Sequence, residues 1–185
     1  MPIYALGDER ARIHPSAFVH PDAVVIGEVH LGAESSVWPC AVIRADNGPI
    51  VIGARSSIQD GAVLHTQPHN GTRVGDDCTI GHLAHLEGCV LEDVVLIGTG
   101  AIVLEQVVCR TVSFVAAGAL VTPRTEVPSG AMAVGVPARL RLDAVKPEMI
   151  TGYAGAYRRH LVQHRDGMRA VDVEECITEN VGRTT

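Results

Sequence analysis

Two histidines, His65 and His82, are the residues of this sequence best suited to chemistry. They lie in the segments SIQDGAVLH (57–65) and TIGHLAHLEGC (79–89). Neutral imidazole is a common ligand of divalent metals, and clusters of polar residues mark a metal site better than single residues do. The polar residues that accompany the two histidines are Arg44, Asp46, Gln59, Asp60, His85 and Glu87. This clustering makes His65 and His82 candidate metal ligands, although a lone histidine on such a surface usually has a structural role.

Four of these polar residues share one place in a six-residue repeat. Each directly follows an apolar residue that is expected to point inward, so its own side chain should point outward, because side chains alternate along a strand. The four are Arg44, Gln59, His65 and Glu87. At most other repeats this place holds glycine or another small residue. We therefore expect the four side chains, together with Asp60 and His82, to line one surface.

The repeat itself places an apolar residue at every sixth position. The first unbroken run is Ile13, Val19, Val25, Leu31, Val37 and Ile43, and the phase resets across residues 45–51 and again across 66–73. A period of six fits neither an α-helix nor a long flat strand, but it fits short strands joined by tight corners. Stacked coils of such strands bury a continuous ladder that no single coil could bury alone. The sequence therefore predicts an all-β chain, a left-handed parallel β-helix of hexapeptide repeats.

The regular repeat ends in the segment PRTEVPSGAMAVGVPAR (123–139), which is rich in glycine and proline. Apolar residues then recur at intervals of three and four between Ile150 and Leu161, which predicts a C-terminal α-helix. We expect a β-helix over residues 1–140 and a helix packed on it over 141–169. Residues 170–185 show no pattern and are expected to form a flexible tail.

Charge and composition argue against several kinds of partner and location. The net charge is −6 and no long basic run is present, which argues against nucleic acid, because phosphate contacts need clustered lysine and arginine. Glycines and charges interrupt the apolar stretches, so we expect no membrane span. The N-terminus lacks the pattern of a secretory signal. The five cysteines are odd in number and form no CxxC motif, which favours reduced thiols in a cytoplasmic protein.

Three segments of the chain resemble the gamma-class carbonic anhydrase-like family. They are VIRAD (42–46), SIQDGAVLH (57–65) and TIGHLAHLEGC (79–89), and the resemblance extends through most of residues 10–140. It implies a homotrimer in which three histidines hold a metal between two subunits. The metal is usually zinc, and another divalent metal such as iron or cobalt would also fit. The implied reaction is the reversible hydration of carbon dioxide to bicarbonate by hydroxide that the metal generates.

Carried over residue by residue, His65 matches the first metal ligand of the family. His82 matches the second, and its different place in the repeat suits a ligand that is donated to the neighbouring subunit. The positions that match the family's supporting residues are Arg44, Asp46, Gln59 and Asp60. The resemblance implies that the arginine and aspartate of VIRAD form interface ion pairs and help to bind bicarbonate. It also implies that the glutamine and aspartate of SIQDGAVLH orient the metal-bound water.

The sequence departs from the family at the third ligand. The family motif GHxxxxHG reads GHLAHLEG here (81–88), so Glu87 stands in place of the third histidine and an extra His85 lies two residues earlier. Two histidines and one glutamate can hold zinc, but a carboxylate makes the bound water less acidic than a third imidazole would. We therefore expect Glu87, or His85 as a substitute, to complete the site and hydration to be weak. The other interpretation is a degraded site in which Glu87 pairs with Arg44 or another cation.

Two further residues, Tyr157 and Trp38, bear on the site, and the function has alternatives. Tyr157 matches a helix tyrosine that reaches the site in some relatives, but helix packing explains it more simply. Trp38 is interpreted as packing at a subunit interface. The segment GVPAR (135–139) resembles the closing motif of many hexapeptide-repeat proteins, including acetyltransferases. The alternatives to a weak carbonic anhydrase are thus an acyltransferase that uses acyl-CoA and a non-catalytic binding or assembly protein.

Overall fold

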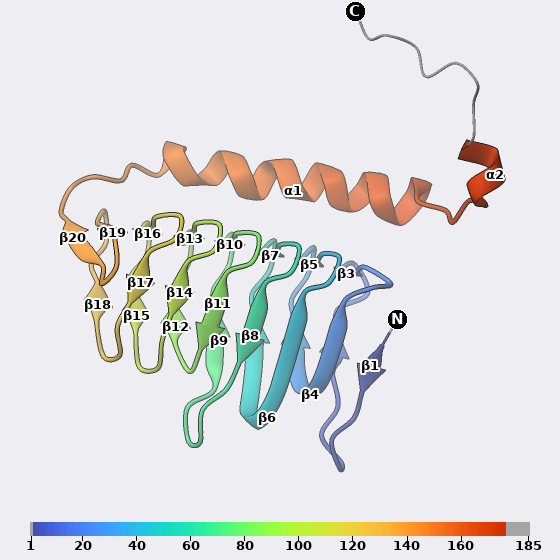
Figure 1. The fold of residues 1–185 in the computed structure, drawn as a ribbon, viewed down its shortest axis with the longest axis horizontal. Coiled ribbons are helices and arrows are strands. Elements are labelled where there is room, and N and C mark those ends of the chain that lie inside the picture. Colours follow the sequence, from blue (N-terminus) through green and yellow to red (C-terminus); the bar gives the residue numbers. More distant parts are fainter. Residues whose placement is uncertain (1, 177–185) are drawn as a thin grey trace, which may run out of the picture.

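Each coil of the chain is built from short strands that pair with the equivalent strands of the coils on either side. The computed structural model describes residues 2–176, and Figure 1 shows the coils stacked in a row with one long helix beside them. The strands described here pair in parallel, except for the last hairpin, which is antiparallel. The predicted all-β fold, a left-handed parallel β-helix of hexapeptide repeats with a C-terminal α-helix, is confirmed.

The strands form two sheets. The twelve-stranded sheet contains β1 (Ile3–Tyr4), β2 (Arg12–Ile13), β4 (Val24–Leu31), β6 (Val42–Ile52), β8 (Val63–His65), β9 (Thr72–Val74), β11 (His85–Glu87), β12 (Val90–Leu91), β14 (Ile102–Val103), β15 (Val108–Cys109), β17 (Leu120–Val121) and β18 (Glu126–Val127). The eight-stranded sheet contains β3 (Phe18–Val19), β5 (Ser36–Val37), β7 (Ser57–Ile58), β10 (Thr79–Ile80), β13 (Leu96–Ile97), β16 (Phe114–Val115), β19 (Met132–Val134) and β20 (Arg139–Arg141).

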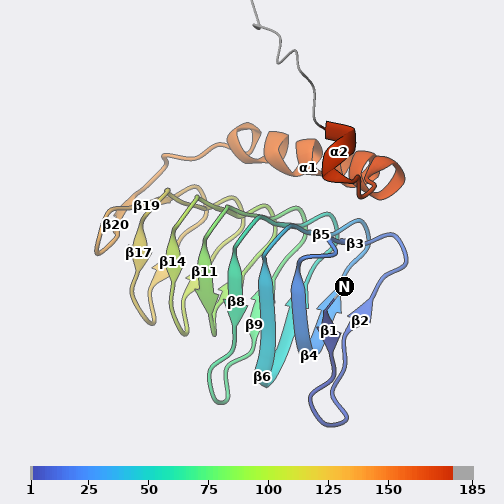
Figure 2. The same ribbon diagram turned by 45° about the vertical axis from the view of Figure 1, so that its right-hand side comes forward.

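The twelve-stranded sheet covers two of the three faces of the β-helix, because two of its strands are long enough to run across a corner. Strand β6 pairs with β8 through residues 42–44 and with β9 through residues 50–52. The first phase reset of the sequence falls inside β6. The second is the loop between β8 and β9, which projects from the stack of coils (Figure 2) and is closed by an antiparallel bridge between Gln67 and Asn70.

The core is a ladder of inward-pointing apolar residues. Ile43, Leu64, Leu86, Val103 and Val121 pair in register from coil to coil, and all five are fully buried. The close spacing of the coils leaves no room for side chains at some corners. A Cβ at Gly81 would lie 2.7 Å from the carbonyl oxygen of Ile97, which explains the glycines that recur after the apolar positions.

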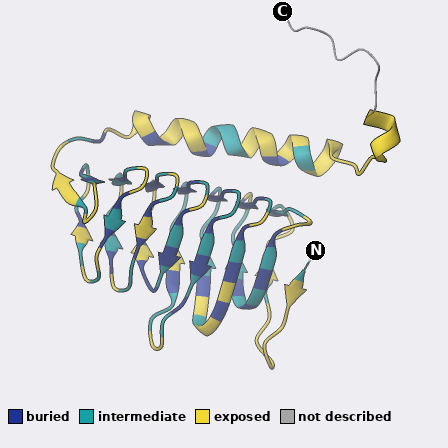
Figure 3. Cartoon of the chain, in the orientation of Figure 1, coloured by how far each residue is buried: buried dark blue, intermediate teal, exposed yellow. Residues whose placement is uncertain are grey.

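Helix α1 (Glu148–Gly167) lies along the eight-stranded sheet and contacts β5 and β10 (Figure 1). Figure 3 shows most of its surface exposed, and its buried residues are Ile150, Ala154 and Leu161. A short helix, α2 (Val173–Cys176), follows. The expected tail at 170–185 begins before α2, and its residues 177–185 lie outside the described part. Within residues 2–176, no helix is both long enough and apolar enough to cross a membrane.

The environment of Trp38 differs from the one expected of a subunit-interface residue. The chain's own helix covers it, and it is only 4% exposed. Its ring packs against those of Phe18, Tyr157 and His164 at centroid distances of 5.5, 5.5 and 5.0 Å. The six-residue repeat shows that the side chain points out of the β-helix, but it does not show what covers that face.

Candidate functional site

A row of polar side chains crosses the outer surface of three neighbouring strands. Arg44 on β6, His65 on β8 and Glu87 on β11 are partners in register. Each directly follows an inward residue of the ladder, so alternation along the strand turns its side chain outward. The structure therefore brings these three predicted site residues together on one face.

His65 lies between two carboxylates within this row. Its Nε2 atom lies 2.8 Å from Oδ1 of Asp46, and its Nδ1 atom lies 3.0 Å from Oε1 of Glu87. An ionised carboxylate can only accept a hydrogen bond, so both bonds form together only when each ring nitrogen carries a proton. Arg44 forms an ion pair with Asp46. Arg44, Asp46, His65 and Glu87 thus form one continuous chain of polar contacts.

Glu87 has two further neighbours. The side-chain amide of Gln67 donates a hydrogen bond to Oε1 of Glu87 at 2.7 Å, and Nε2 of His85 lies 3.4 Å from Oε2. Burial raises the pKa of Glu87, but the hydrogen bonds from His65 and His85 outweigh it and hold the pKa below its usual value. Asp46 behaves similarly. Burial raises its pKa, and the hydrogen bond and charge of His65 together with the charge of Arg44 bring it below the usual value.

A second polar group lies elsewhere, where the turn after β10 meets helix α1. Nδ1 of His82 lies 3.0 Å from Oδ2 of Asp60, and the hydroxyl of Tyr157 lies 3.3 Å from Nε2 of His82. Tyr157 also packs on Trp38. The structure thus shows the helix packing that was expected of Tyr157, and its contact with His82 leaves a role at the site as a prediction.

Gln59 does not join the row of Arg44, His65 and Glu87, so the expectation of one common surface is wrong for this residue. It follows β7 in the eight-stranded sheet and is 5% exposed. A six-residue period marks equivalent places on successive faces of a coil, and Gln59 lies one face before His65. His82 and Asp60 are likewise separated from the row within one chain.

The residues of the row have the chemistry of metal ligands but do not complete a site. The row supplies one imidazole, from His65, and one carboxylate, from Glu87, and zinc and other divalent transition metals accept both as ligands. Among residues 2–176, however, no group of three or more His, Cys, Asp and Glu side chains is arranged to hold a metal ion. Since His82 belongs to the other polar group, its part as a ligand beside His65 and Glu87 stays a prediction.

Gln67 was missed as a site residue in the sequence. It lies in the loop at the second phase reset, outside the repeat, so no equivalent position drew attention to it. The one available signal was its spacing of two residues from His65, which places both side chains on the same side of an extended segment.

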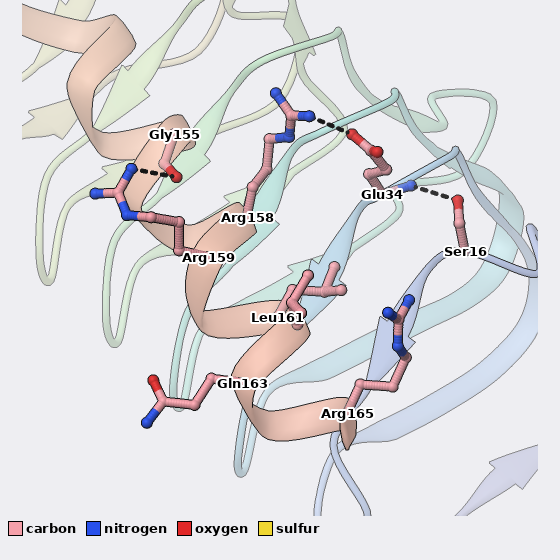
Figure 4. A pocket seen from close by; sticks show the side chains of 9 residues that line it. Ser16, Glu34, Gly155, Arg158, Arg159, Leu161, Gln163 and Arg165 are labelled. Carbon is pink, nitrogen blue, oxygen red and sulfur yellow. Dashed lines mark hydrogen bonds and ion pairs between the residues drawn. The ribbon is translucent and has the colours of Figure 1, made fainter. Parts of the chain in front are cut away.

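A groove of about 760 Å³ lies between α1 and the first coils, as Figure 4 shows. It contains none of the predicted site residues. The arginines that line it already have partners in the chain. Arg158 pairs with Glu34 at 2.9 Å, Arg159 donates to the carbonyl of Gly155 at 3.2 Å, and Arg165 pairs with Asp166 at 2.9 Å. We therefore assign the candidate site to the polar row rather than to this groove.

Comparison with known proteins agrees with the resemblance of the three segments. No family model matches the sequence. Gamma carbonic anhydrase 1 of Arabidopsis thaliana, a mitochondrial protein, is 35% identical over 182 residues, which cover 92% of this chain and 66% of the relative. Gamma carbonic anhydrase 2 of the same plant is 31% identical, with coverages of 95% and 68%. Carnitine operon protein CaiE of Escherichia coli is 37% identical, with coverages of 69% and 65%. The chain thus spans about two thirds of the length of these relatives.

Solved structures with the same fold carry names from the transferases. A Bacillus cereus protein whose name suggests an acetyltransferase has a TM-score of 0.86 and 31% identity, with coverages of 90% of this chain and 98% of the other. A hexapeptide transferase family protein from Anaplasma phagocytophilum has a TM-score of 0.80, 29% identity and the same coverages. Perosamine N-acetyltransferase from Caulobacter crescentus, in complex with CoA and GDP-perosamine, has a TM-score of 0.53 and 28% identity, with coverages of 71% and 56%.

Proposed function

Because the chain belongs to the gamma carbonic anhydrase-like family of hexapeptide-repeat proteins, we propose that it is a homotrimeric metalloprotein that slowly and reversibly hydrates carbon dioxide to bicarbonate. The observation that supports this proposal most is the row formed by Arg44, His65 and Glu87, with Asp46 bridging the first two. Arg44, Asp46 and His65 match the family's residues at these positions, and Glu87 stands where the family has its third histidine.

The separation of the polar residues into two groups supports a shared site. One group contains His65 and Glu87, and the other contains His82 and Asp60, on a different part of the same chain. In a trimer, the first group of one subunit would face the second group of its neighbour. Each of the three interfaces would then hold one complete site, and a single chain would hold none.

The chain's residues would divide the chemistry as follows. His65 and Glu87 of one subunit and His82 of another would hold zinc, iron or cobalt, with His85 as the substitute for Glu87. When bound, such a metal supplies Lewis acidity that makes a water molecule a nucleophile near neutral pH. The guanidinium of Arg44, held by Asp46, would bind the bicarbonate anion. Gln59 and Asp60, from the subunit that donates His82, would orient the attacking water.

We expect weak activity because Glu87 brings a negative charge to the third-ligand position. A carboxylate offsets part of the positive charge of a divalent metal, so the acidity of the water is lower than with three neutral imidazoles. All five cysteines are free, which supports a cytoplasmic location. The net charge of −6 supports small-molecule substrates rather than nucleic acid.

The proposal is tested by metal analysis and by stopped-flow carbon dioxide hydration on the same purified sample, with light scattering to measure the size of the assembly. The wild type should be a trimer with about one metal per subunit, and His65→Ala should lose both metal and activity. His69→Asn is the matched control, because His69 is an exposed histidine of the loop that directly follows β8. A stable monomer, or full metal content in His65→Ala, would overturn the proposal.

A mixing experiment tests whether two subunits share the site. Trimers of His65→Ala alone and of His82→Ala alone should both lack metal. Trimers reassembled from a mixture of the two variants should recover metal at interfaces where an intact His65 meets an intact His82. If the site lies within one chain, mixing restores nothing, since each variant chain lacks one ligand.

The acyltransferase interpretation remains the second candidate, because the structures with TM-scores of 0.86 and 0.53 carry acetyltransferase names. Calorimetric titration with coenzyme A and acetyl-CoA separates it from the first candidate. Micromolar binding of either compound, together with absence of metal, would favour acyl transfer. A metal-loaded trimer that neither hydrates carbon dioxide nor binds coenzyme A would instead indicate a binding or assembly role.

A further inference from the structure

We propose that Gln67 is a positioning residue for Glu87. Its side-chain amide, acting with His65, holds one oxygen of the Glu87 carboxylate so that the other oxygen is presented to a metal ion. This inference rests on the proposed function, since it concerns how Glu87 replaces the family's third histidine.

The two oxygens of Glu87 have different surroundings. Oε1 accepts hydrogen bonds from Nε2 of Gln67 at 2.7 Å and from Nδ1 of His65 at 3.0 Å. Oε2 has one partner, Nε2 of His85, whose hydrogen bond is long at 3.4 Å and therefore weak. Oε1 is therefore saturated, and Oε2 is the atom that remains available to a ligand.

The fold holds Gln67 in place through the loop between β8 and β9. The backbone of Gln67 exchanges two hydrogen bonds with Asn70, at 3.1 and 2.9 Å. The loop rests on Gly88, the residue after Glu87. A Cβ on Gly88 would meet the Cβ atoms of Asn70 and Gln67 at 3.3 and 3.4 Å, and its φ of 59° also favours glycine. The amide of Gln67 is thus brought against Glu87 by the backbone on both sides.

A glutamate ligand needs such support more than a histidine does. The terminal torsion of glutamate is broad, so an unsupported carboxylate spreads its oxygens over many orientations. An imidazole is a rigid ring with its donor atom fixed at one end. A neighbour that hydrogen-bonds a metal-ligating carboxylate typically affects metal affinity by roughly 10–100-fold. The Gln67 amide has the contact required for that effect.

The experiment measures zinc affinity by competition with a chromophoric chelator, using trimeric protein from which metal has been removed. Gln67→Met keeps the length of the side chain and removes the donor, so affinity should fall by roughly 10–100-fold. His69→Asn in the same loop is the matched control and should change affinity by less than about twofold. Thermal unfolding of each variant checks that the trimer remains folded.

A second background separates positioning from general damage to the loop. In Glu87→His, the metal ligand at position 87 is an imidazole that does not need the amide of Gln67. Adding Gln67→Met to this variant should therefore change its zinc affinity by less than about threefold. The visible spectrum of the cobalt-loaded protein should change with Gln67→Met in the natural background and not in Glu87→His.

The outcomes distinguish this inference from the proposed function. Zinc binding by the wild type with no loss in Gln67→Met overturns the role of Gln67 alone. An equal loss in both backgrounds also overturns it, because Gln67 then acts on something other than Glu87. If neither the wild type nor Glu87→His binds zinc, the metal site itself is wrong and the positioning role falls with it.

Discussion

Replacing Glu87 with glutamine should lower stability at neutral pH and leave it nearly unchanged in acid. Glu87→Gln keeps the shape of the side chain and removes its charge. The wild-type carboxylate accepts two short hydrogen bonds, from His65 and from Gln67. In the variant these become bonds to a neutral acceptor, or meet the amide's own N–H groups, which cannot accept.

The magnitude follows from these two bonds. A hydrogen bond to a charged group contributes about 1.5–3 kcal/mol, against about 1 kcal/mol for a neutral pair. The Glu87 side chain is 19% exposed, so water recovers part of the loss. We expect Glu87→Gln to lower the free energy of unfolding by about 1–2 kcal/mol per subunit at pH 7.

The pH dependence has a definite sign. The pKa of Glu87 in the folded protein lies below its usual value of 4.5, so the ionised carboxylate stabilises the folded state above that value. This stabilisation decreases as the pH falls through the lowered folded-state pKa, because both states are then protonated. The difference in the free energy of unfolding between wild type and Glu87→Gln should therefore be largest at pH 7 and should decrease steadily below pH 4.5.

The assay is urea unfolding of metal-free protein, followed by circular dichroism at one fixed protein concentration, from pH 7 down to pH 3.5. A fixed concentration is needed because the stability of an oligomer depends on it. Glu105→Gln serves as control, since Glu105 makes no side-chain hydrogen bond to the described residues 2–176. A Glu87→Gln protein as stable as the wild type at pH 7 would refute the reasoning, and so would a gap that widens in acid.

Three other substitutions have expected outcomes. Leu86→Ala shortens a fully buried side chain of the ladder and should lower the free energy of unfolding by about 3–5 kcal/mol, measured by chemical denaturation. A loss below about 1 kcal/mol would mean that the coils shift to fill the cavity that the shortened side chain leaves. Trp38→Ala should lower the free energy of unfolding by about 3–5 kcal/mol. It should also speed hydrogen exchange of the backbone amides of α1. Exchange as slow as in the wild type would show that Trp38 does not hold the helix in place. Glu87→His should speed carbon dioxide hydration by the zinc-loaded protein, because a neutral ligand leaves the metal more Lewis-acidic. A slower variant would show that the carboxylate is needed for turnover.

The fold could be predicted because the six-residue period is a property of the backbone geometry of the coil. An inward residue is needed on every strand, and Ile43, Leu64 and Leu86 meet that need in register. The same rule placed Arg44, His65 and Glu87 side by side, since each follows one of these inward residues. Sequence alone was sufficient wherever the site depends on the repeat.

The parts that could not be predicted depend on contacts outside the repeat. The error over Gln59 is of another kind, because no insertion separates it from His65 and a spacing of six residues already places the two on successive faces of one coil. Gln67 reaches Glu87 only because the loop closes through Asn70 and rests on Gly88. Trp38 is covered by a helix that lies more than a hundred residues away in the chain. For Gln67 and Trp38, a packing arrangement outside the repeat decides the environment.

The contacts of His82 limit how a shared site can form. The carboxylate of Asp60 lies beside Nδ1 of His82. In a neutral imidazole, Nδ1 then carries the proton and Nε2 carries the lone pair. The hydroxyl of Tyr157 lies 3.3 Å from this Nε2 atom and can donate a hydrogen bond to it. A neutral imidazole nitrogen has one lone pair, so it cannot accept from a hydroxyl and bind a metal at once. If His82 is the ligand donated to a neighbouring subunit, Tyr157 has to release Nε2 when metal binds there. The contact costs little to break, since a single neutral hydrogen bond contributes about 1 kcal/mol and structural zinc binding contributes about 10–16 kcal/mol. The tyrosine can therefore hold the ring in the orientation of a ligand without preventing the metal from taking its place.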